Sequence, residues 1–387
     1  MQSEQLSAAL LALEGEHRRR QRHVLETPQQ PEVVVDGKPY IAFASNDYLG
    51  LANHPALIAA AQQGLARWGL GGGSSHLVSG HFAAHEEAEQ ALARFVRCEA
   101  ALLFGSGYAA NLAVIASLVG RGDAVFADRL NHASLNDGCV LSRATFKRFR
   151  HNDLTHLRQL LESTPARRRL IAVDAVYSMD GDEAPLKGLL ELAEAYDAWL
   201  YVDDAHGFGV LGEGHGSLVD AGLSSPRLIY MATLGKAAGV AGAFVAGTEL
   251  LVEWLVNSAR TYIFTTAQPP ALAEAVKASL TLIAEESWRR ERLQQLVACM
   301  QQLMTGSYYR LNASRTAIQP LIIGSNEQAL SLAERLRQAG FWVPAIRPPT
   351  VPQGTARLRV SLSAAHTLPQ LEALLHCVLQ SAGGQEV

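Results

Sequence analysis

The chain has 387 residues, of which 48% are hydrophobic and 18% charged, and its formal net charge is −4 at neutral pH. This composition predicts a large buried core in one or two domains and excludes a mainly disordered chain. The small negative charge gives no reason to expect a nucleic-acid partner, and no apolar run reaches the roughly 18 residues of a membrane span, so we expect neither nucleic acid nor membrane as a partner.

The cysteines and the amino-terminal segment indicate the cellular compartment. The four cysteines are far apart and form no CxxC pair: Cys98, Cys139, Cys299 and Cys377. Disulfides and a zinc site are therefore not expected, and we predict no metal. The segment MQSEQLSAALLALEGEHRRR lacks the layout of a signal peptide, and its acidic residues argue against a transit peptide. We expect a cytoplasmic protein.

The elements predicted in chain order begin with an arm over residues 1–45, a helix followed by an extended segment. Short apolar runs then alternate with helical patterns, and seven of the runs read as strands: 100–104, 124–129, 144–149, 170–176, 199–203, 228–233 and 242–247. Continuous apolar strands alternating with helices predict a mostly parallel sheet that is covered on both faces.

The carboxyl-terminal part has a different pattern. A long helix over 287–304 precedes a strand at 318–324, a helix at 326–340, strands at 341–348 and 357–363, and a last helix at 368–380. We therefore predict an α/β protein with a large, mostly parallel seven-stranded domain over residues 46–284. A smaller α+β domain is expected over residues 285–387.

Polar residues and glycine turns follow the predicted strands, where open parallel sheets bind ligands. GSGYAAN after the first strand places Gly107 and Tyr108 at the start of a helix, whose N–H groups favour phosphate. Six other side chains follow later strands in the same way: His132, Ser178, Asp203, His206, Thr233 and Lys236. The sequence thus predicts a phosphate site, a carboxylate, histidines and a lysine on one rim.

Pyridoxal 5'-phosphate needs all of these groups together. Its aldehyde reacts with a lysine, its pyridine nitrogen pairs with a carboxylate, and its phosphate needs N–H donors. Lys236 stands among small residues in MATLGKAAGVAGAFVAG, where loss of solvent lowers the pKa of an ammonium and makes it a usable base. We therefore predict this cofactor, with Lys236 holding it.

The blocks VDDAHGFGVLG and TLGKAAGVAGA resemble the α-oxoamine synthases, which are fold-type I enzymes similar to aspartate aminotransferase. The resemblance extends through SNDYLGL, GGGSSHLVSG, GYAAN, DRLNHASL and YSMDGD to IRPPTVPQGTARLRVSLSAAHT, and so covers nearly the whole chain. That last block is similar to the biotin-pathway branch of the family. The branch condenses L-alanine with a pimeloyl thioester, carried by coenzyme A or acyl carrier protein, to 8-amino-7-oxononanoate, with loss of carbon dioxide.

The resemblance implies a role for each matching residue. Lys236 would hold the cofactor and move protons, Asp203 would pair with the pyridine nitrogen, and His206 would bind the phenolate oxygen. His132 would stack on the ring and face the substrate. The remaining cofactor contacts would come from Gly107, Tyr108, Thr233 and Ser178. The family is homodimeric, so we expect a homodimer.

The resemblance also implies the substrate contacts. Asn46 would reach into the site from the arm, Arg347 would take the amino-acid carboxylate, and Thr350 would contact the acyl substrate. Because a pimeloyl chain ends in a carboxylate, we also expect a cation at its far end, and among the arm arginines we favour Arg20 by its offset from Asn46.

Three blocks depart from the family pattern, at four positions. Asp174 and Ala175 replace a Glu-Gly pair, His76 replaces an arginine, and Ala243 replaces the last glycine of GxxGG, a one-methyl change that we expect to be tolerated. The shorter Asp174 leaves the role of that acid open.

Three alternatives compete with this interpretation. A sister synthase would use glycine or serine with another acyl-CoA, which the IRPPTVP block argues against. A nicotinamide oxidoreductase needs GxGxxG after a strand, and GLGGGSS lacks that spacing. A paralogue without catalytic activity would be expected to lose the lysine that is present here.

Overall fold

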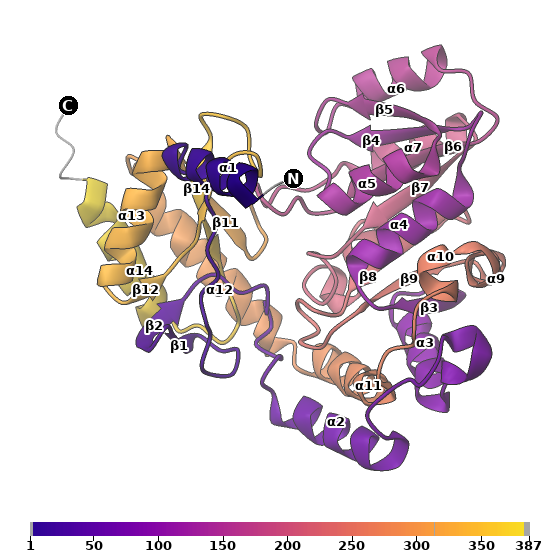
Figure 1. Cartoon of the computed structure of the whole chain (residues 1–387), viewed down its shortest axis with the longest axis horizontal. Helices are drawn as coiled ribbons and strands as arrows, with labels where there is room; N and C mark the ends of the chain where they lie inside the picture. The colour runs from indigo at the N-terminus through magenta and orange to yellow at the C-terminus, as the bar shows by residue number, and fades with distance from the viewer. Residues whose placement is uncertain (1–2, 313, 383–387) are drawn as a thin grey trace. The chain divides into compact units, whose positions relative to one another are not determined.

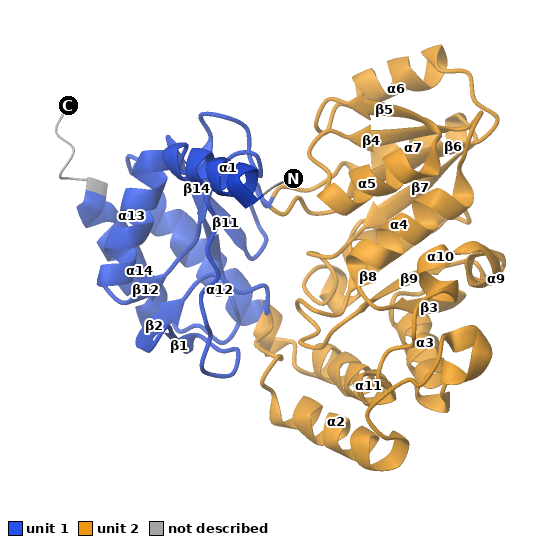
Figure 2. Cartoon of the chain, viewed as in Figure 1, with its two compact units in different colours: residues 1–48, 179–181, 291–387 blue, residues 49–178, 182–290 orange. Residues whose placement is uncertain are grey.

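The computed structural model describes residues 3–312 and 314–382, which form two compact units. Figure 1 labels the elements along the chain and Figure 2 colours the units. Unit 1 comprises residues 1–48, 179–181 and 291–387, and unit 2 comprises residues 49–178 and 182–290. The arm thus groups with the carboxyl-terminal segment, whereas the division into three domains at residues 45 and 284 stays a prediction.

Unit 2 contains a seven-stranded sheet with the order β3-β9-β8-β7-β6-β4-β5. The strands are β3 Ala100–Phe104, β4 Ala124–Asp128, β5 Thr145–Phe149, β6 Arg169–Asp174, β7 Ala198–Asp203, β8 Leu228–Thr233 and β9 Ala243–Gly247. All neighbours pair in parallel except that β9 is antiparallel to both β3 and β8. The predicted seven-stranded, mostly parallel sheet is therefore confirmed.

Helices cover both faces of this sheet, which is why its inner strands are largely apolar. The edge strand β5 is partly exposed and carries Lys147 and Arg148. One face packs against α4 Gly107–Leu118, α5 Ala133–Ser142 and α9 Glu249–Ser258, in a cluster that includes Val125, Leu170 and Val245. Successive side chains of a strand point to opposite faces, so Phe126 and Leu200 lie on the other face. Both are fully buried, so that face is covered too.

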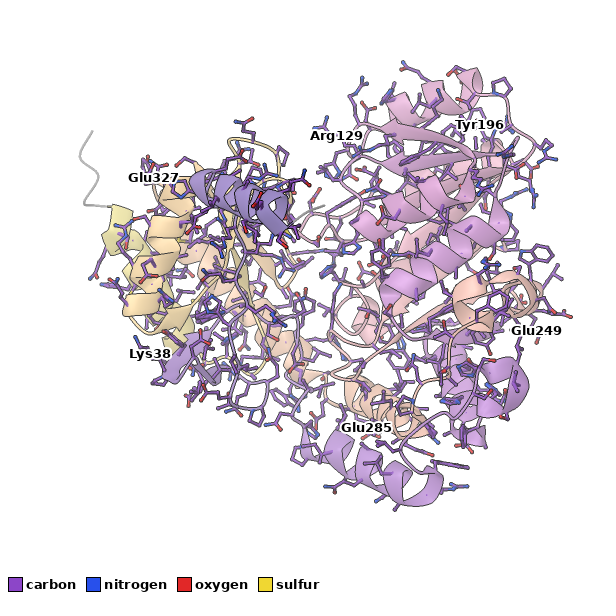
Figure 3. All side chains as sticks on the ribbon, viewed as in Figure 1. Lys38, Arg129, Tyr196, Glu249, Glu285 and Glu327 are labelled. Atoms are coloured by element: carbon purple, nitrogen blue, oxygen red, sulfur yellow. The ribbon has the colours of Figure 1, made fainter. Side chains whose placement is uncertain are left out.

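The remaining helices of unit 2 pack around the sheet and against each other. They are α2 Pro55–Trp68, α3 Ala83–Phe95, α6 Leu154–Ser163, α7 Leu186–Ala195, α8 Ser217–Asp220, α10 Arg260–Ile263 and α11 Pro270–Glu285, with short turns η1 His76–Gly80 and η2 Gly212–Gly214. A Cβ at Gly64 of α2 would lie 2.8 Å from Ala271 Cα, so this glycine allows α2 to approach α11 closely. Tyr196, labelled in Figure 3, follows α7 and donates to Glu162 of α6 at 2.7 Å.

Unit 1 contains two small sheets. β10 Arg310–Leu311, β11 Ile318–Gly324, β14 Ala356–Ser361 and β13 Ala345–Ile346 form one, and β1 Glu32–Val35, β2 Lys38–Ala42 and β12 Phe341–Trp342 form the other. Its helices are α1 Ser3–Gly15, α12 Trp288–Met304, α13 Asn326–Gln338 and α14 Leu368–Ala382, of which α12 begins in unit 2.

Two segments of unit 1 differ from the sequence prediction. The extended arm segment is a hairpin, because Asp36 and Gly37 have φ angles of 48° and 74° and reverse the chain between β1 and β2. The single strand predicted over 341–348 is divided: β12 pairs in parallel with β2, and β13 pairs with β14. The arm is therefore part of a sheet that needs residues from near the carboxyl terminus.

Among the residues that the structure describes, no helix is both long enough and apolar enough to cross a membrane.

Candidate active site

The carboxyl-terminal ends of neighbouring parallel strands place the predicted side chains of unit 2 along one edge of the sheet. Asp174, the last residue of β6, pairs in register with Asp203, the last residue of β7, and Asp203 pairs with Met231 of β8. His132 follows β4 and Lys236 follows β8. The sheet therefore brings together the groups that the sequence places after separate strands.

Lys236 lies on a tight loop between β8 and β9. Its Nζ is 3.0 Å from Nε2 of His206. The loop is closed by backbone bonds from the N–H of Leu234 to the Gly242 carbonyl and from the N–H of Gly239 to the Lys236 carbonyl. A Cβ at Gly239, where φ is 68°, would lie 2.6 Å from the backbone nitrogen of Ala52, so a side chain there would disturb the loop. Backbone geometry thus holds the lysine beside the histidine.

Asp203 is buried, and both of its carboxylate oxygens accept hydrogen bonds. Oδ1 accepts from the backbone N–H of Ala205 at 3.0 Å, and Oδ2 accepts from Asn111 Nδ2 at 2.8 Å. The two hydrogen bonds hold the carboxylate in one orientation at the end of β7.

His132 caps the amino terminus of α5. Its Nδ1 lies 2.7 Å from Ser134 Oγ and also accepts from the Ser134 backbone N–H at 3.3 Å. Burial lowers the pKa of His132; the charge of Lys236 lowers it further, whereas that of Asp203 opposes the shift. A neutral imidazole is the form that this position favours.

Asp174, one of the departures from the family pattern, is hydrogen-bonded to the backbone of His132. Its Oδ2 accepts from the His132 backbone N–H at 2.7 Å. Burial raises the pKa of Asp174 well above its usual value, and the nearby charge of Asp203 adds to that rise. The aspartate therefore fixes the backbone at the cap of α5.

The predicted phosphate side combines the amino terminus of α4 with the end of β8. Ser106 caps α4 by accepting from the N–H of Ala109 at 3.1 Å. A Cβ at Gly107 would lie 3.9 Å from Cβ of Thr233, so these two residues are neighbours. Tyr108 is exposed and its hydroxyl bonds to Asp137. Ser178 is half-buried and lies in the short hairpin after β6 that is closed by the antiparallel bridge between Val176 and Glu183.

The predicted substrate residues in unit 1 fall into two groups. Arg20 donates to Thr350 Oγ1 at 3.1 Å, and both line a cavity of about 750 Å³ together with Arg347. Burial, and then the charge of Arg20, lowers the pKa of Arg347 from its usual value. Asn46 forms the second group, with different hydrogen-bond partners: its Oδ1 accepts from Arg359 and from Tyr48, each at 3.1 Å.

Sequence reasoning gave no role to two of these contacting residues. Asn111 is 1% exposed and bonds to Asp203, and Arg359 is 6% exposed and bonds to Asn46 and Ser361. The available signals were an asparagine at the start of a predicted helix and an arginine that alternates with apolar residues in the strand predicted over 357–363, since buried polar side chains are retained where they have partners.

A histidine cluster lies in η1 and the start of α3. Ring nitrogens of His76, His81 and His85 lie within 4.8 Å of one another, a spacing that could admit a metal ion. His85, however, accepts from the Phe82 N–H at 3.2 Å and contacts the Gln268 carbonyl at 3.0 Å, so both of its ring nitrogens have backbone partners. His76, which departs from the family pattern, stacks on Tyr262 with ring centroids 4.8 Å apart.

Comparison with known proteins defines the class first. The family model for aminotransferases of class I and II matches residues 38–378. Serine palmitoyltransferase from S. paucimobilis, solved with PLP and myriocin bound, has a TM-score of 0.92 and 32% identity, covering 98% of this chain and 97% of its own.

Two further relatives define the group within that class. 8-Amino-7-oxononanoate synthase from Chromobacterium violaceum is 68% identical over 382 residues, which cover 99% of this chain and 100% of the relative. The crystal structure of 8-amino-7-oxononanoate synthase from Francisella tularensis has a TM-score of 0.78 and 30% identity, covering 89% of this chain and 98% of its own. The chain therefore belongs to the aminotransferase class I and II family and, within it, to the 8-amino-7-oxononanoate synthases. This membership confirms the predicted fold class and excludes a nicotinamide oxidoreductase.

Proposed function

We propose that this protein binds pyridoxal 5'-phosphate and condenses L-alanine with a pimeloyl thioester. The products are 8-amino-7-oxononanoate, carbon dioxide and the free thiol carrier, and the reaction belongs to biotin biosynthesis. The full-length likeness to synthases of that name supports the substrates. The observation that carries the chemistry is the lysine of unit 2 beside a histidine, with Lys236 Nζ 3.0 Å from His206 Nε2, on the sheet edge that also holds Asp203.

The donor set fits this cofactor. Asp203 offers a buried carboxylate to a protonated ring nitrogen, His206 offers a ring nitrogen to an oxygen near the lysine, and α4 offers N–H groups to phosphate at Gly107 and Tyr108. When bound, pyridoxal phosphate supplies an electron sink for the bonds broken at the amino-acid α-carbon. Thr233 and Ser178 complete the proposed set of contacts.

Lys236 is the proposed base. Its side-chain nitrogen lies among small residues and beside His206, which can take the Nζ proton and leave the neutral amine that acts as the base. The lysine accepts the α-proton of alanine and later returns a proton to the product carbon, as a general base and acid must do within hydrogen-bond reach.

His132 is proposed to face the substrate as a neutral imidazole. Ser134 directs donors at Nδ1, so the remaining nitrogen, Nε2, carries the proton and can donate to a carbonyl or carboxylate oxygen. Asp174 holds the backbone of this cap.

The substrate groups of unit 1 are also part of the proposal. Arg347 takes the alanine carboxylate, Thr350 contacts the acyl chain, and Arg20 takes the far carboxylate of the pimeloyl group. The hydrogen bond between Arg20 and Thr350 supports a shared acyl site. The cavity that they line also holds Arg18, Arg19 and Arg337, together with the carboxylates of Glu14 and Glu334. Asn46 contacts the reacting part of the substrate, held by Arg359.

The assembly and compartment complete the proposal. We infer a homodimer, because the resemblance implies paired subunits. We infer a cytoplasmic location, because four widely spaced cysteines without a CxxC pair are typical of proteins in a reducing compartment. Sedimentation of the purified protein tests the dimer.

The test of function is a substrate panel. The cofactor-loaded protein is titrated with L-alanine, glycine and L-serine while its visible absorbance is recorded, and product is identified by mass spectrometry with pimeloyl-CoA, pimeloyl acyl carrier protein and palmitoyl-CoA. We expect a spectral change and 8-amino-7-oxononanoate with alanine and a pimeloyl carrier. Preference for glycine or serine would assign a sister synthase, and cofactor binding without product from any pair would indicate a paralogue without catalytic activity.

A further inference from the structure

A buried amide lies early in helix α4, next to the proposed cofactor site. Asn111 is 1% exposed, and its neighbours in the helix, Ala110 and Val114, belong to the hydrophobic cluster beneath the sheet. Asparagine is a poorer helix former than alanine, and a buried amide destabilises a fold unless it is fully hydrogen-bonded. The position would suit an apolar side chain, so the bonds of the amide explain why a polar residue is present.

All of the hydrogen-bonding groups at the head of the amide have partners. Nδ2 donates to Asp203 Oδ2 and to Ser134 Oγ, each at 2.8 Å, and Oδ1 accepts from the Tyr201 hydroxyl at 2.6 Å. The partners come from β7 and α5, which are distant in sequence. One side chain therefore ties the proposed ring-nitrogen partner to the cap of α5.

Tyr201 fixes which way the amide faces. It is fully buried, and burial, followed by the charges of Asp203 and Asp174, raises its pKa well above the usual value, so the hydroxyl keeps its proton and donates. Oδ1 must then face Tyr201, and both N–H groups face Asp203 and Ser134. A reversed amide would place its oxygen against the carboxylate oxygen of Asp203, where neither can donate.

The same bonds reach the ring of His132. Ser134 Oγ accepts from Asn111 and lies 2.7 Å from His132 Nδ1, to which its own hydrogen can be donated. The Ser134 backbone N–H points at the same nitrogen. Nδ1 is therefore an acceptor, and the proton of the neutral ring is on Nε2.

We propose that Asn111 is a positioning residue that orients the Asp203 carboxylate directly and the His132 ring through Ser134. The inference rests on the proposed function, since both oriented groups act toward the cofactor and substrate. Asn111 itself touches neither. Its effect passes through the direction and hydrogen bonding of the two groups that do.

The test compares Asn111→Ala with Val114→Ala in the full-length, cofactor-loaded protein. Val114 is fully buried in the same helix and the same cluster, so its truncation controls for loss of packing. We expect Asn111→Ala to lower kcat by about tenfold to a hundredfold and to raise the cofactor Kd about tenfold, the size expected for losing a hydrogen bond to a charged group. The KM for pimeloyl-CoA should stay within about twofold in both variants.

A second variant keeps the inference testable if Asn111→Ala does not fold. Tyr201→Phe removes one hydroxyl and leaves the shape of the site, so the amide is free to reverse. We expect a smaller fall in kcat, about threefold to tenfold, and no additional fall when Tyr201→Phe is combined with Asn111→Ala. Nitrogen NMR of histidine-labelled protein, with the His132 signal assigned by its loss in His132→Gln, should show protonated Nε2 in wild type and a mixture of tautomers in Asn111→Ala.

Several outcomes would overturn the inference. An Asn111→Ala protein with unchanged cofactor Kd and less than a threefold fall in kcat would do so, and so would equal kinetic losses in Asn111→Ala and Val114→Ala at equal Tm. An unchanged His132 signal would remove the link through Ser134. Failure of the wild type to bind cofactor or to form product would instead refute the proposed function, so the two failures can be told apart.

Discussion

His151 gives a prediction about stability that can be worked from the structure. It follows β5, and its ring lies between two carboxylates, with Nδ1 3.1 Å from Asp128 Oδ1 and Nε2 2.7 Å from Asp182 Oδ2. Burial by itself would lower the pKa of His151, but the hydrogen bonds and charges of Asp128 and Asp182 outweigh it and raise the pKa to about 9. His151 is therefore a positively charged link between β4, β5 and the hairpin that carries Ser178.

The sign of the pH dependence follows from a folded pKa above the unfolded one. The stabilisation is fully present below about pH 6.5, where His151 is protonated in both states, and is lost as the pH rises to about 9, where the folded form deprotonates. A rise from 6.5 to about 9 corresponds to about 3 kcal/mol of folding free energy. Because the Asp182 side chain is 32% exposed and thus screened by solvent, we expect about 2 kcal/mol.

The perturbation is His151→Gln, which keeps hydrogen-bonding groups but removes the charge. The free energy of unfolding by urea is measured near pH 6 and near pH 9.5 for both proteins, so that the other titrating groups cancel in the difference. Wild type should lose about 2 kcal/mol more than the variant over this range. His156→Gln is the matched control, since His156 Nδ1 accepts from the backbone N–H of Arg150, whereas the His151 ring bonds to carboxylates. Equal pH dependence in wild type and His151→Gln would refute the reasoning.

Substitutions in the proposed site give four further expectations. Lys236→Ala should keep the fold but lose turnover and the borohydride-fixed cofactor; near-normal turnover would contradict its role. Asp203→Asn should retain cofactor and lose roughly a hundredfold in kcat, as expected for a ring-nitrogen pKa lowered by about 2; an unimpaired spectral response to alanine would contradict it. Wild type should use heptanoyl-CoA at least roughly thirtyfold less efficiently than pimeloyl-CoA, and Arg20→Ala should narrow that gap by harming the pimeloyl reaction; equal kcat/KM values in wild type would remove the case for a distal-carboxylate site. Arg347→Ala should raise the KM for alanine more than Arg359→Ala does, and the reverse order would assign the alanine carboxylate to Arg359.

The sheet of unit 2 could be predicted because its inner strands are buried on both faces and so read as nearly uninterrupted apolar runs, unlike the edge strand β5 with its Lys147 and Arg148. The run from Leu170 to Asp174 is an example, since β6 lies inside the sheet and ends in a polar residue at the ligand edge. The arm hairpin was missed although Asp36-Gly37 is a common turn pair between apolar runs. The short strand at Phe341 and Trp342 could not be placed, because its partner is β2, about 300 residues earlier.

The positions of the site residues followed from strand ends, but their supporting partners did not. Asn111 contacts Asp203 across 92 residues and Ser134 across 23, and Arg359 contacts Asn46 across 313. A single sequence carries no local signal for such pairs, because burial of a polar side chain is known only once the fold is known. Asp174 shows the same limit: its shorter side chain left its role open, and the bond to the His132 backbone comes from the pairing of β4 with β6.

The pairing of β2 with β12 has a consequence for folding of the chain during translation. Ile41 and Phe43 donate their backbone N–H groups to the carbonyls of Gly340 and Trp342, each at 2.9 Å. During translation, this edge of β2 therefore has no pairing strand until residue 342 has left the ribosome. Throughout that interval the hairpin presents open backbone groups to other nascent chains. Lys38, labelled in Figure 3, and Pro39 both lie on β2. Charged side chains and proline on an edge strand disfavour its pairing with strands of other chains.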